Sequence, residues 1–443
     1  MRNIVFAALI APVLSSPSFA NPATDGDGLV MSGQSGALSV AGYEILADQV
    51  RLPETGGVIL SGATLTRPGR DGSVLIRQLE APDTGLLSQL LDPGAACDPT
   101  QTETGTVLAR DVRFRPDSDL GVPGGREEIR IPLLTLETSR IGCSWRLVAS
   151  ADGVTVSGVD GSRIDIMTIE GRLRMSGDAL RDVDARLDLI GVDLNGAEGP
   201  GGLRAEEVGF SLKADLSEGA LIDLVGAGAG LSDLLSATSG SVTRGGAYMR
   251  GLELVPDLFL SERDLDRLGL DGADPVIGDL ELTASLEAGA FRVRASSDLS
   301  GLVRGELDLS GSLPDPDGPA VPDAIASAVP VPVELIGIRF ERASVSYEDL
   351  GAAAVVEHLS GRRPETLVSA LIGDRIGRVS ARLPGGLPAT VNVAWGSILE
   401  MVTEGRGAVG VRPETPFSLL EFAVSGMMGP AMAASRTGAW REN

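Results

Sequence analysis

The sequence is poor in the residues that most often carry out chemistry in proteins. Its 443 residues contain one histidine, His358, one lysine, Lys213, and two cysteines. A Ser-His-Asp or Cys-His site would have to use His358, and neither the G-x-S-x-G nor the H-E-x-x-H motif occurs. A zinc site would need more histidine or cysteine ligands than the chain offers. We therefore predict no catalytic residue, no metal site and no cofactor, with His358 on a helix surface near Gly361.

Aromatic residues and positive charges are also scarce. Phe, Trp and Tyr make up 3% of the chain, and the formal net charge is −24. Few aromatic rings disfavour a carbohydrate platform and the aromatic girdles of an outer-membrane barrel. The acidic balance argues against nucleic acid as a partner and against docking on an anionic lipid surface, since both require Lys and Arg.

The first 20 residues have the pattern of a signal peptide. Arg2 provides a positive start, Ile4–Leu14 an apolar core, and Ser18-Phe19-Ala20 a cleavage site before Asn21. We predict that residues 1–20 are removed and that the protein is periplasmic or secreted; an apolar first helix of the fold is the alternative. Charges interrupt every later apolar run, so we predict no transmembrane segment after signal removal.

The two cysteines lie in the next part of the chain, residues 21–150. Short apolar runs separated by Gly and Asp predict that this part is rich in β-strands. In an oxidising compartment Cys97 and Cys143 are expected to form a disulfide. Two separate buried thiols are the alternative.

The clearest pattern is the alternation of polar and apolar residues in Asp279–Leu313. Asp279–Glu287, Phe291–Ser296 and Val303–Leu309 each alternate, with turn residues between them. Such alternation places one class of side chain on each face of a strand and predicts a three-stranded meander. Similar strands begin near Val154, and a phase change after Leu189 predicts a β-bulge.

These patterns predict a mainly β protein. We expect a long, twisted, mostly antiparallel sheet of amphipathic strands, with a few short helices covering part of one face. Residues 151–313 would form the long strand array, 314–332 a proline-rich linker or loop, and 333–443 a C-terminal α+β part.

The C-terminal part mixes helix and strand signals. We expect helices over Leu350–Leu359, capped by Asp349 and ended by Gly361, and over Glu365–Ile372, opened by Pro364. Strands are expected at Arg378–Leu383 and Val391–Trp395, and a last helix over Phe417–Ala423. Earlier helical segments are expected within Leu86–Leu91, Ser217–Ser236 and Ser261–Leu270.

The apolar face of the meander is the candidate ligand-binding surface. A long sheet that is apolar on one face has more apolar area than a few helices can cover, and such faces are typical of ligand or partner sites. The residues that we expect to line it are Leu280, Leu282, Leu286, Phe291, Val293, Leu307 and Leu309.

The alternation through Val154–Leu313, followed by the strand-then-helix unit Ala343–Gly351, resembles bacterial envelope proteins of the AsmA-like and DUF945/DUF2125 type. The resemblance implies a long curved β-sheet with an apolar groove for lipid. We expect no N-terminal membrane anchor in this chain, which is a departure from AsmA-like members, and no functional residue of the family can be transferred.

The leading hypothesis is a non-enzymatic protein of the envelope that binds or carries a lipid or another amphiphile. An envelope protein is the other partner that we consider. Two alternatives remain open, namely a secreted hydrolase that uses two of the 61 carboxylates, and a purely structural scaffold.

Overall fold

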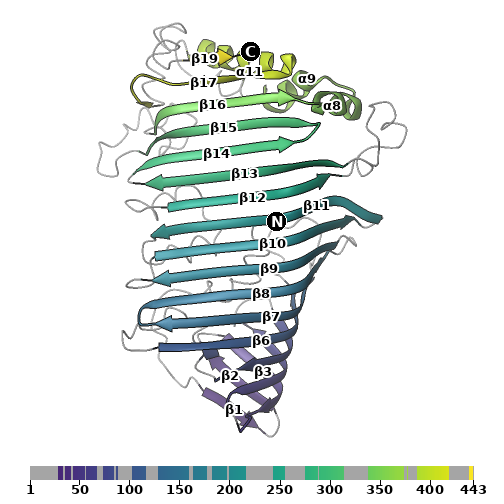
Figure 1. Ribbon diagram of the computed structural model, residues 1–443, viewed down its shortest axis with the longest axis vertical. Coiled ribbons are helices and arrows are strands. Elements are labelled where there is room, and N and C mark those ends of the chain that lie inside the picture. Colours follow the sequence, from purple (N-terminus) through teal and green to yellow (C-terminus); the bar gives the residue numbers. More distant parts are fainter. Residues whose placement is uncertain are drawn as a thin grey trace. The chain divides into compact units, whose positions relative to one another are not determined.

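The computed structural model consists mainly of β-strands (Figure 1). The residues that it describes are 28–32, 35–40, 43–54, 56–66, 73–83, 86–87, 102–115, 128–158, 163–176, 182–196, 199–215, 243–254, 275–287, 289–313, 338–373, 377, 387–418 and 439–442. The chain divides into two compact units, Met1–Thr238 and Ser239–Asn443. Their boundary falls inside residues 151–313, the range that the sequence pattern presents as one array.

The first unit is an antiparallel meander in which each strand pairs with the next along the chain. Its strands are β1 Gly28–Ser32, β2 Ser35–Val40, β3 Tyr43–Arg51, β4 Val58–Thr66, β5 Ser73–Ala81, β6 Thr102–Arg115, β7 Glu128–Ile141, β8 Ser144–Ser157, β9 Arg163–Ser176, β10 Asp182–Gly196 and β11 Gly199–Asp215. No pairing among these described strands joins β1 to β11, so the sheet is not closed.

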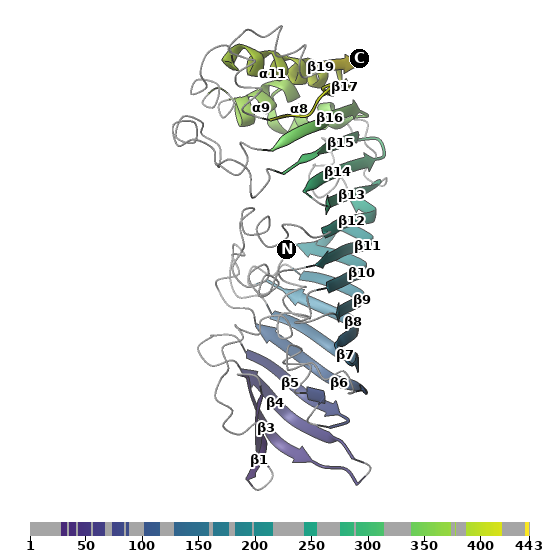
Figure 2. The same cartoon turned by 90° about the vertical axis from the view of Figure 1, so that its left-hand side faces the viewer.

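The second unit continues the same pattern and adds helices. Its elements are β12 Thr243–Leu254, β13 Val276–Glu287, β14 Ala290–Leu299, β15 Val303–Ser312, β16 Arg339–Asp349, α8 Ala352–Ser360, α9 Pro364–Val368, a π-helical turn Ser369–Gly373, α11 Leu387–Glu404, β17 Arg406–Val411, β18 Phe417–Ser418 and β19 Ala439–Glu442. Figure 2 shows α8, α9 and α11 on one side of β16 and β17. The predicted fold class, an antiparallel sheet of amphipathic strands with a few short helices, is confirmed.

The core of the first unit lies on one face of its sheet. The most deeply buried large side chains, among them Leu60, Leu147 and Leu187, are about 1–2% exposed and alternate with less buried residues along their strands. Leu86 and Leu87 form a helical turn against this face, and the amide of Leu86 donates to Asp83 Oδ1 at 2.7 Å. The described part of the predicted Leu86–Leu91 helical turn is therefore present.

A line of irregular positions crosses the first sheet, and we call it the crease. From β3 to β11 the ladder of each neighbouring strand pair has an interruption, and the interrupted positions oppose one another. β10 and β11 also shift register between Leu194 and Gly196, outside this line. The alternation of buried residues changes phase there, for example from Ala151 to Val154 and from Ile166 to Ile169. The positions are Asp48, Gly62, Arg77, Asp111, Pro132, Gly153, Met167, Gly191 and Glu206.

The crease corrects the predicted β-bulge after Leu189. The register of β10 with β9 and β11 is the same before and after the interruption, so no extra residue is inserted. Instead, Gly191 has a φ of 63°, and Gly62, Asp111 and Gly153 have similar positive φ values on alternate strands. The alternation of β10 does change phase after Leu189. The left-handed backbone at Gly191, rather than an inserted residue, accounts for this change.

Two predicted helices of the C-terminal part are confirmed. Asp349 Oδ1 accepts hydrogen bonds from the amides of Gly351 and Ala353 at 3.0 and 3.1 Å, which caps the start of α8. Gly361 ends α8 with a φ of 64°, and its amide donates to the carbonyl of Glu357. Pro364 occupies the first turn of α9.

Two predictions in this part are wrong. Val391–Trp395, expected as a strand, lies inside α11, because a short apolar run fits a helix as well as a strand. Phe417 and Ser418, expected to begin a helix, form strand β18 and pair with Phe340 and Arg339 of β16. These two residues continue the pairing line of β17 along β16, and tertiary pairing of this kind overrides a local helix-start signal.

Several predictions fall outside the described residues. They are the signal peptide 1–20, Cys97, the helices within Ser217–Ser236 and Ser261–Leu270, the proline-rich stretch 314–332 and the strand Arg378–Leu383. Cys143 lies in the turn between β7 and β8, and no free cysteine occurs in the part of the chain that is described. The Cys97–Cys143 disulfide stays a prediction.

Candidate functional site

The seven residues predicted to line an apolar face lie together on one face of β13, β14 and β15. The confirmed meander pairs Leu286 with Phe291 and Val293 with Leu309. Leu282 and Leu307 both lie opposite Ala295, on either side of it. Directly opposed residues in a sheet share a face, so the register itself assembles this surface.

The same face extends to the neighbouring strands of the unit. Ala247 of β12 lies opposite Leu282, Val345 of β16 lies opposite Leu307, and Val409 of β17 lies opposite Val345. An apolar row therefore runs across six strands, from β12 to β17. We call the surface formed by this row and the seven predicted residues the apolar face of the second unit.

The apolar face of the second unit is only half-buried. Leu280, Leu282, Phe291 and Val293 are partly exposed, and Leu307 is 40% exposed. The equivalent face of the first unit is closed, since its residue Leu187 is 1% exposed. The same strand pattern thus gives a largely buried apolar face in the first unit and a half-exposed apolar face in the second.

An aromatic cluster lies at one end of this face. The rings of Phe291 and Phe340 meet edge to face with centroids 6.3 Å apart, and Phe417 follows at 6.2 Å from Phe340. Gly311 lies under this contact, because a Cβ there would be 2.9 Å from the ring of Phe291. Of these residues only Phe291 was among the predicted site residues. Phe340 could have been found from its alternation, but Phe417 could not, because its pairing is a long-range contact.

Few polar groups interrupt the apolar face. Ser297 and Tyr347 lie on it through their pairing with Leu280 and Gly305. Burial, with a smaller contribution from the nearby Asp349 carboxylate, raises the pKa of Tyr347. At neutral pH this phenol is therefore an uncharged hydrogen-bonding group beside an otherwise apolar surface.

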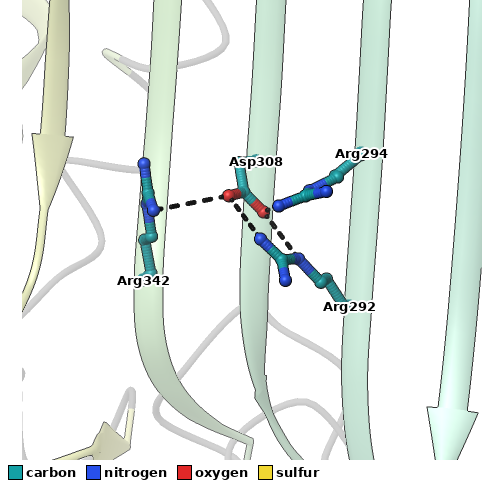
Figure 3. Close-up of polar contacts among 4 residues, drawn as sticks. All are labelled: Arg292, Arg294, Asp308 and Arg342. Atoms are coloured by element: carbon teal, nitrogen blue, oxygen red, sulfur yellow. Dashed lines mark hydrogen bonds and ion pairs between the residues drawn. The ribbon is translucent and has the colours of Figure 1, made fainter.

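The opposite face of the same strands carries a cluster of arginines around one aspartate. Arg292 of β14 donates to Asp308 of β15 from two nitrogens, Nε to Oδ1 at 3.2 Å and Nη2 to Oδ2 at 3.0 Å. Arg294 and Arg342 approach the same carboxylate at 3.6 Å from two further sides (Figure 3). The Asp308 side chain is 5% exposed, whereas the arginines remain half-exposed.

This cluster holds Asp308 in its charged form. The hydrogen bonds from Arg292, helped by the charges of Arg292, Arg294 and Arg342, lower the pKa of Asp308 despite its burial. The alternation in the sequence had placed these residues only on the polar face of their strands. The alternation of Arg292, Arg294 and Asp308 was visible in the sequence, but their convergence depends on the register of three strands.

Other candidate sites are less developed. A hollow of about 460 Å³ lies between β2, β3 and β4 and is lined by Leu46, Asp48 and Gly62 among others, and none of the predicted site residues lines it. His358 lies in the last turn of α8, near Gly361 as expected. No group of three potential metal ligands occurs among the described residues.

The fold and this surface define a protein built of open antiparallel sheets with one half-exposed apolar face. No helix in the described part of the chain is long and apolar enough to span a membrane. No family model and no curated protein matches the chain. The resemblance to AsmA-like envelope proteins therefore stays a prediction based on sequence texture.

Proposed function

We propose that this protein is a non-enzymatic envelope protein of the periplasm that binds a lipid or another amphiphile on the apolar face of the second unit. The observation that carries the proposal is the half-exposure of that face, with Leu307 at 40%. Burying an exposed apolar side chain is favourable by about 25 cal/mol per Å². A contiguous set of such side chains is therefore a favourable surface for an apolar occupant.

The chemistry of the surface favours a hydrocarbon chain as that occupant. Apart from the polar residues Thr243, Ser297, Tyr347 and Asp349, the six strands present mainly alkyl and aromatic groups along their paired rows. Glycine and alanine alternate with leucine and valine in these rows, as Gly305, Ala295 and Gly311 show. A flexible methylene chain can lie along such rows of alkyl and aromatic side chains.

A chain-length series tests the proposal. The purified mature protein is titrated with a series of single-chain amphiphiles that share one uncharged headgroup and differ only in alkyl length. Each methylene buried on the face should contribute about 0.8 kcal/mol, which lowers Kd about fourfold per carbon. An affinity that is independent of alkyl length would contradict the proposal.

A matched pair of variants locates the binding surface. Leu307 and Glu306 are adjacent on β15 and lie on opposite faces, and both are exposed. Leu307→Gln should weaken binding of the longest amphiphile about tenfold or more, since it replaces an apolar contact with an amide. Glu306→Gln should leave binding unchanged. Equal effects of the two substitutions would place the ligand elsewhere.

Extraction of the native protein with organic solvent adds an independent measurement. Recovery of lipid from the wild-type protein, but not from Leu307→Gln, would support a carrier function. Absence of extracted lipid, together with failure of the alkyl series to bind, would favour a structural scaffold. Turnover of an ester or glycoside substrate by the purified chain would favour the hydrolase alternative.

A further inference from the structure

The cluster of Arg292, Arg294 and Arg342 around Asp308 has more positive than negative charge. Three guanidinium groups approach one carboxylate, so Asp308 can compensate only one of them. This local excess occurs in a chain whose formal net charge is −24. A local excess of positive charge on the protein surface attracts anions to that position.

The hydrogen-bond geometry leaves two of the arginines available. Arg292 already occupies both carboxylate oxygens of Asp308, at 3.2 and 3.0 Å. Arg294 and Arg342 stand at 3.6 Å, a distance of electrostatic attraction rather than of a direct hydrogen bond. Their side chains are 53% and 45% exposed, so both arginines are accessible to a solvent-borne ligand.

Hydroxyl groups surround the arginines on the same face. Ser310 lies between Arg292 and Arg342, opposite both, and Ser344 lies opposite Asp308. Thr283 lies opposite Arg294. Guanidinium and hydroxyl groups are donors suited to oxyanions, and arginine binds phosphate oxygens in pairs.

We propose that Arg294 and Arg342, oriented by Asp308, form a binding site for a phosphate group. The Asp308 carboxylate lies between these two side chains and holds them in place, and the anion binds to their remaining donors beside Ser310 and Ser344. The group is either free phosphate or the phosphate of a lipid headgroup. The site lies on the face opposite the apolar surface, so it is independent of the function proposed above.

A neighbouring arginine on the same face provides a matched control. Arg304 of β15 contacts Asp298 and Glu348, both at 3.2 Å, so its charge is compensated by two carboxylates. It is 57% exposed, close to the exposure of Arg294. Arg304→Gln therefore removes an equally exposed arginine without removing an excess positive charge.

The experiment titrates the purified mature chain with inorganic phosphate by calorimetry, at an ionic strength held constant with sodium chloride. Wild-type protein should bind saturably, and Arg294→Gln and Arg342→Gln should each weaken binding about tenfold or more, as expected for a charged hydrogen bond. Arg304→Gln should change Kd less than about twofold. Circular dichroism confirms that each variant is folded.

A second arm distinguishes the source of the phosphate. Sedimentation with vesicles of phosphatidylglycerol, and with vesicles of phosphatidylcholine as a neutral comparison, measures headgroup binding. Phosphatidylglycerol binding that requires Arg294 and Arg342, without binding of inorganic phosphate, identifies a lipid headgroup; the reverse identifies free phosphate. If neither ligand binds, or if Arg304→Gln weakens binding as much as Arg294→Gln, the proposal is wrong. Leu307→Gln should affect neither measurement, which separates this test from that of the apolar face.

Discussion

Arg292 binds Asp308 through both carboxylate oxygens, and the pair joins β14 to β15 on the polar face of the second unit. Asp308 is almost fully buried beneath the arginines, although Arg304 and Glu306 on the same face of β15 are exposed. The aspartate is therefore part of the structure of the sheet, and its loss should be measurable.

Asp308→Asn should destabilise the protein by about 1–3 kcal/mol at neutral pH, because it leaves three arginines facing one another without a carboxylate. The pKa of Asp308 is lowered in the folded protein from its ordinary value of 3.8. A lowered pKa gives stability that is present above that ordinary value and is lost as the pH falls through the folded pKa.

Urea unfolding of wild type and Asp308→Asn between pH 7 and pH 2 measures this effect. The difference in free energy of unfolding should be constant at neutral pH and should shrink below about pH 3.8. A difference that stays the same down to pH 2 would mean that the carboxylate charge contributes nothing.

The crease predicts unequal costs for two otherwise similar substitutions. Gly191 and Gly153 have φ values of 63° and 66°, so a Cβ at either position costs about 1–2 kcal/mol in backbone strain. A Cβ at Gly191 would also be 2.9 Å from Met167 Cβ, whereas at Gly153 the nearest atom, Pro132 Cγ, is 3.8 Å away.

Gly191→Ala should therefore reduce the free energy of unfolding more than Gly153→Ala. Denaturation of the two variants in parallel with wild type measures both costs. Equal losses would show that the Met167 contact relaxes freely, and no loss in either variant would contradict the left-handed backbone.

The two apolar faces should respond differently to truncation. Leu187→Ala, in the closed core of the first unit, should cost about 2–5 kcal/mol because it opens a cavity. Leu307→Ala, at 40% exposure, should cost less than about 1 kcal/mol. Thermal unfolding of both variants provides the comparison, and a large loss for Leu307→Ala would mean that this face is a packed core in solution.

The predicted disulfide and the predicted removal of residues 1–20 can be tested on one sample of the protein. Peptide mapping without reductant should find Cys97 linked to Cys143 and a chain that begins at Asn21. Cys97→Ser should lower stability by roughly 4 kcal/mol, from the loop-closure entropy that the bridge removes. Two unlinked cysteines, or an intact residue 1–20 segment, would overturn the respective prediction.

Local patterns were sufficient for much of the fold. Alternation identified β13–β15 and placed Leu280, Phe291 and Leu307 on one face, because side chains on a strand alternate with a period of two. Asp349 and Gly361 marked the ends of α8, since capping is a local interaction.

Long-range relationships were beyond these patterns. Val391–Trp395 could not be assigned to a helix from its composition, and Phe417 became a strand residue only through pairing with Phe340. The aligned positions of the crease, such as Gly191 beside Met167, depend on the register of nine strands. Register is a property of neighbouring strands together and is not contained in any one of them.

The sequence by itself therefore determined that this protein is an antiparallel β protein with amphipathic strands, because periodicity and turn residues act locally. Only the tertiary structure decided which apolar face is closed and which stays half-exposed, since burial depends on what packs over a strand. It also decided that Asp308 is buried among Arg292, Arg294 and Arg342. Charged residues on three different strands converge only when the register brings them opposite one another.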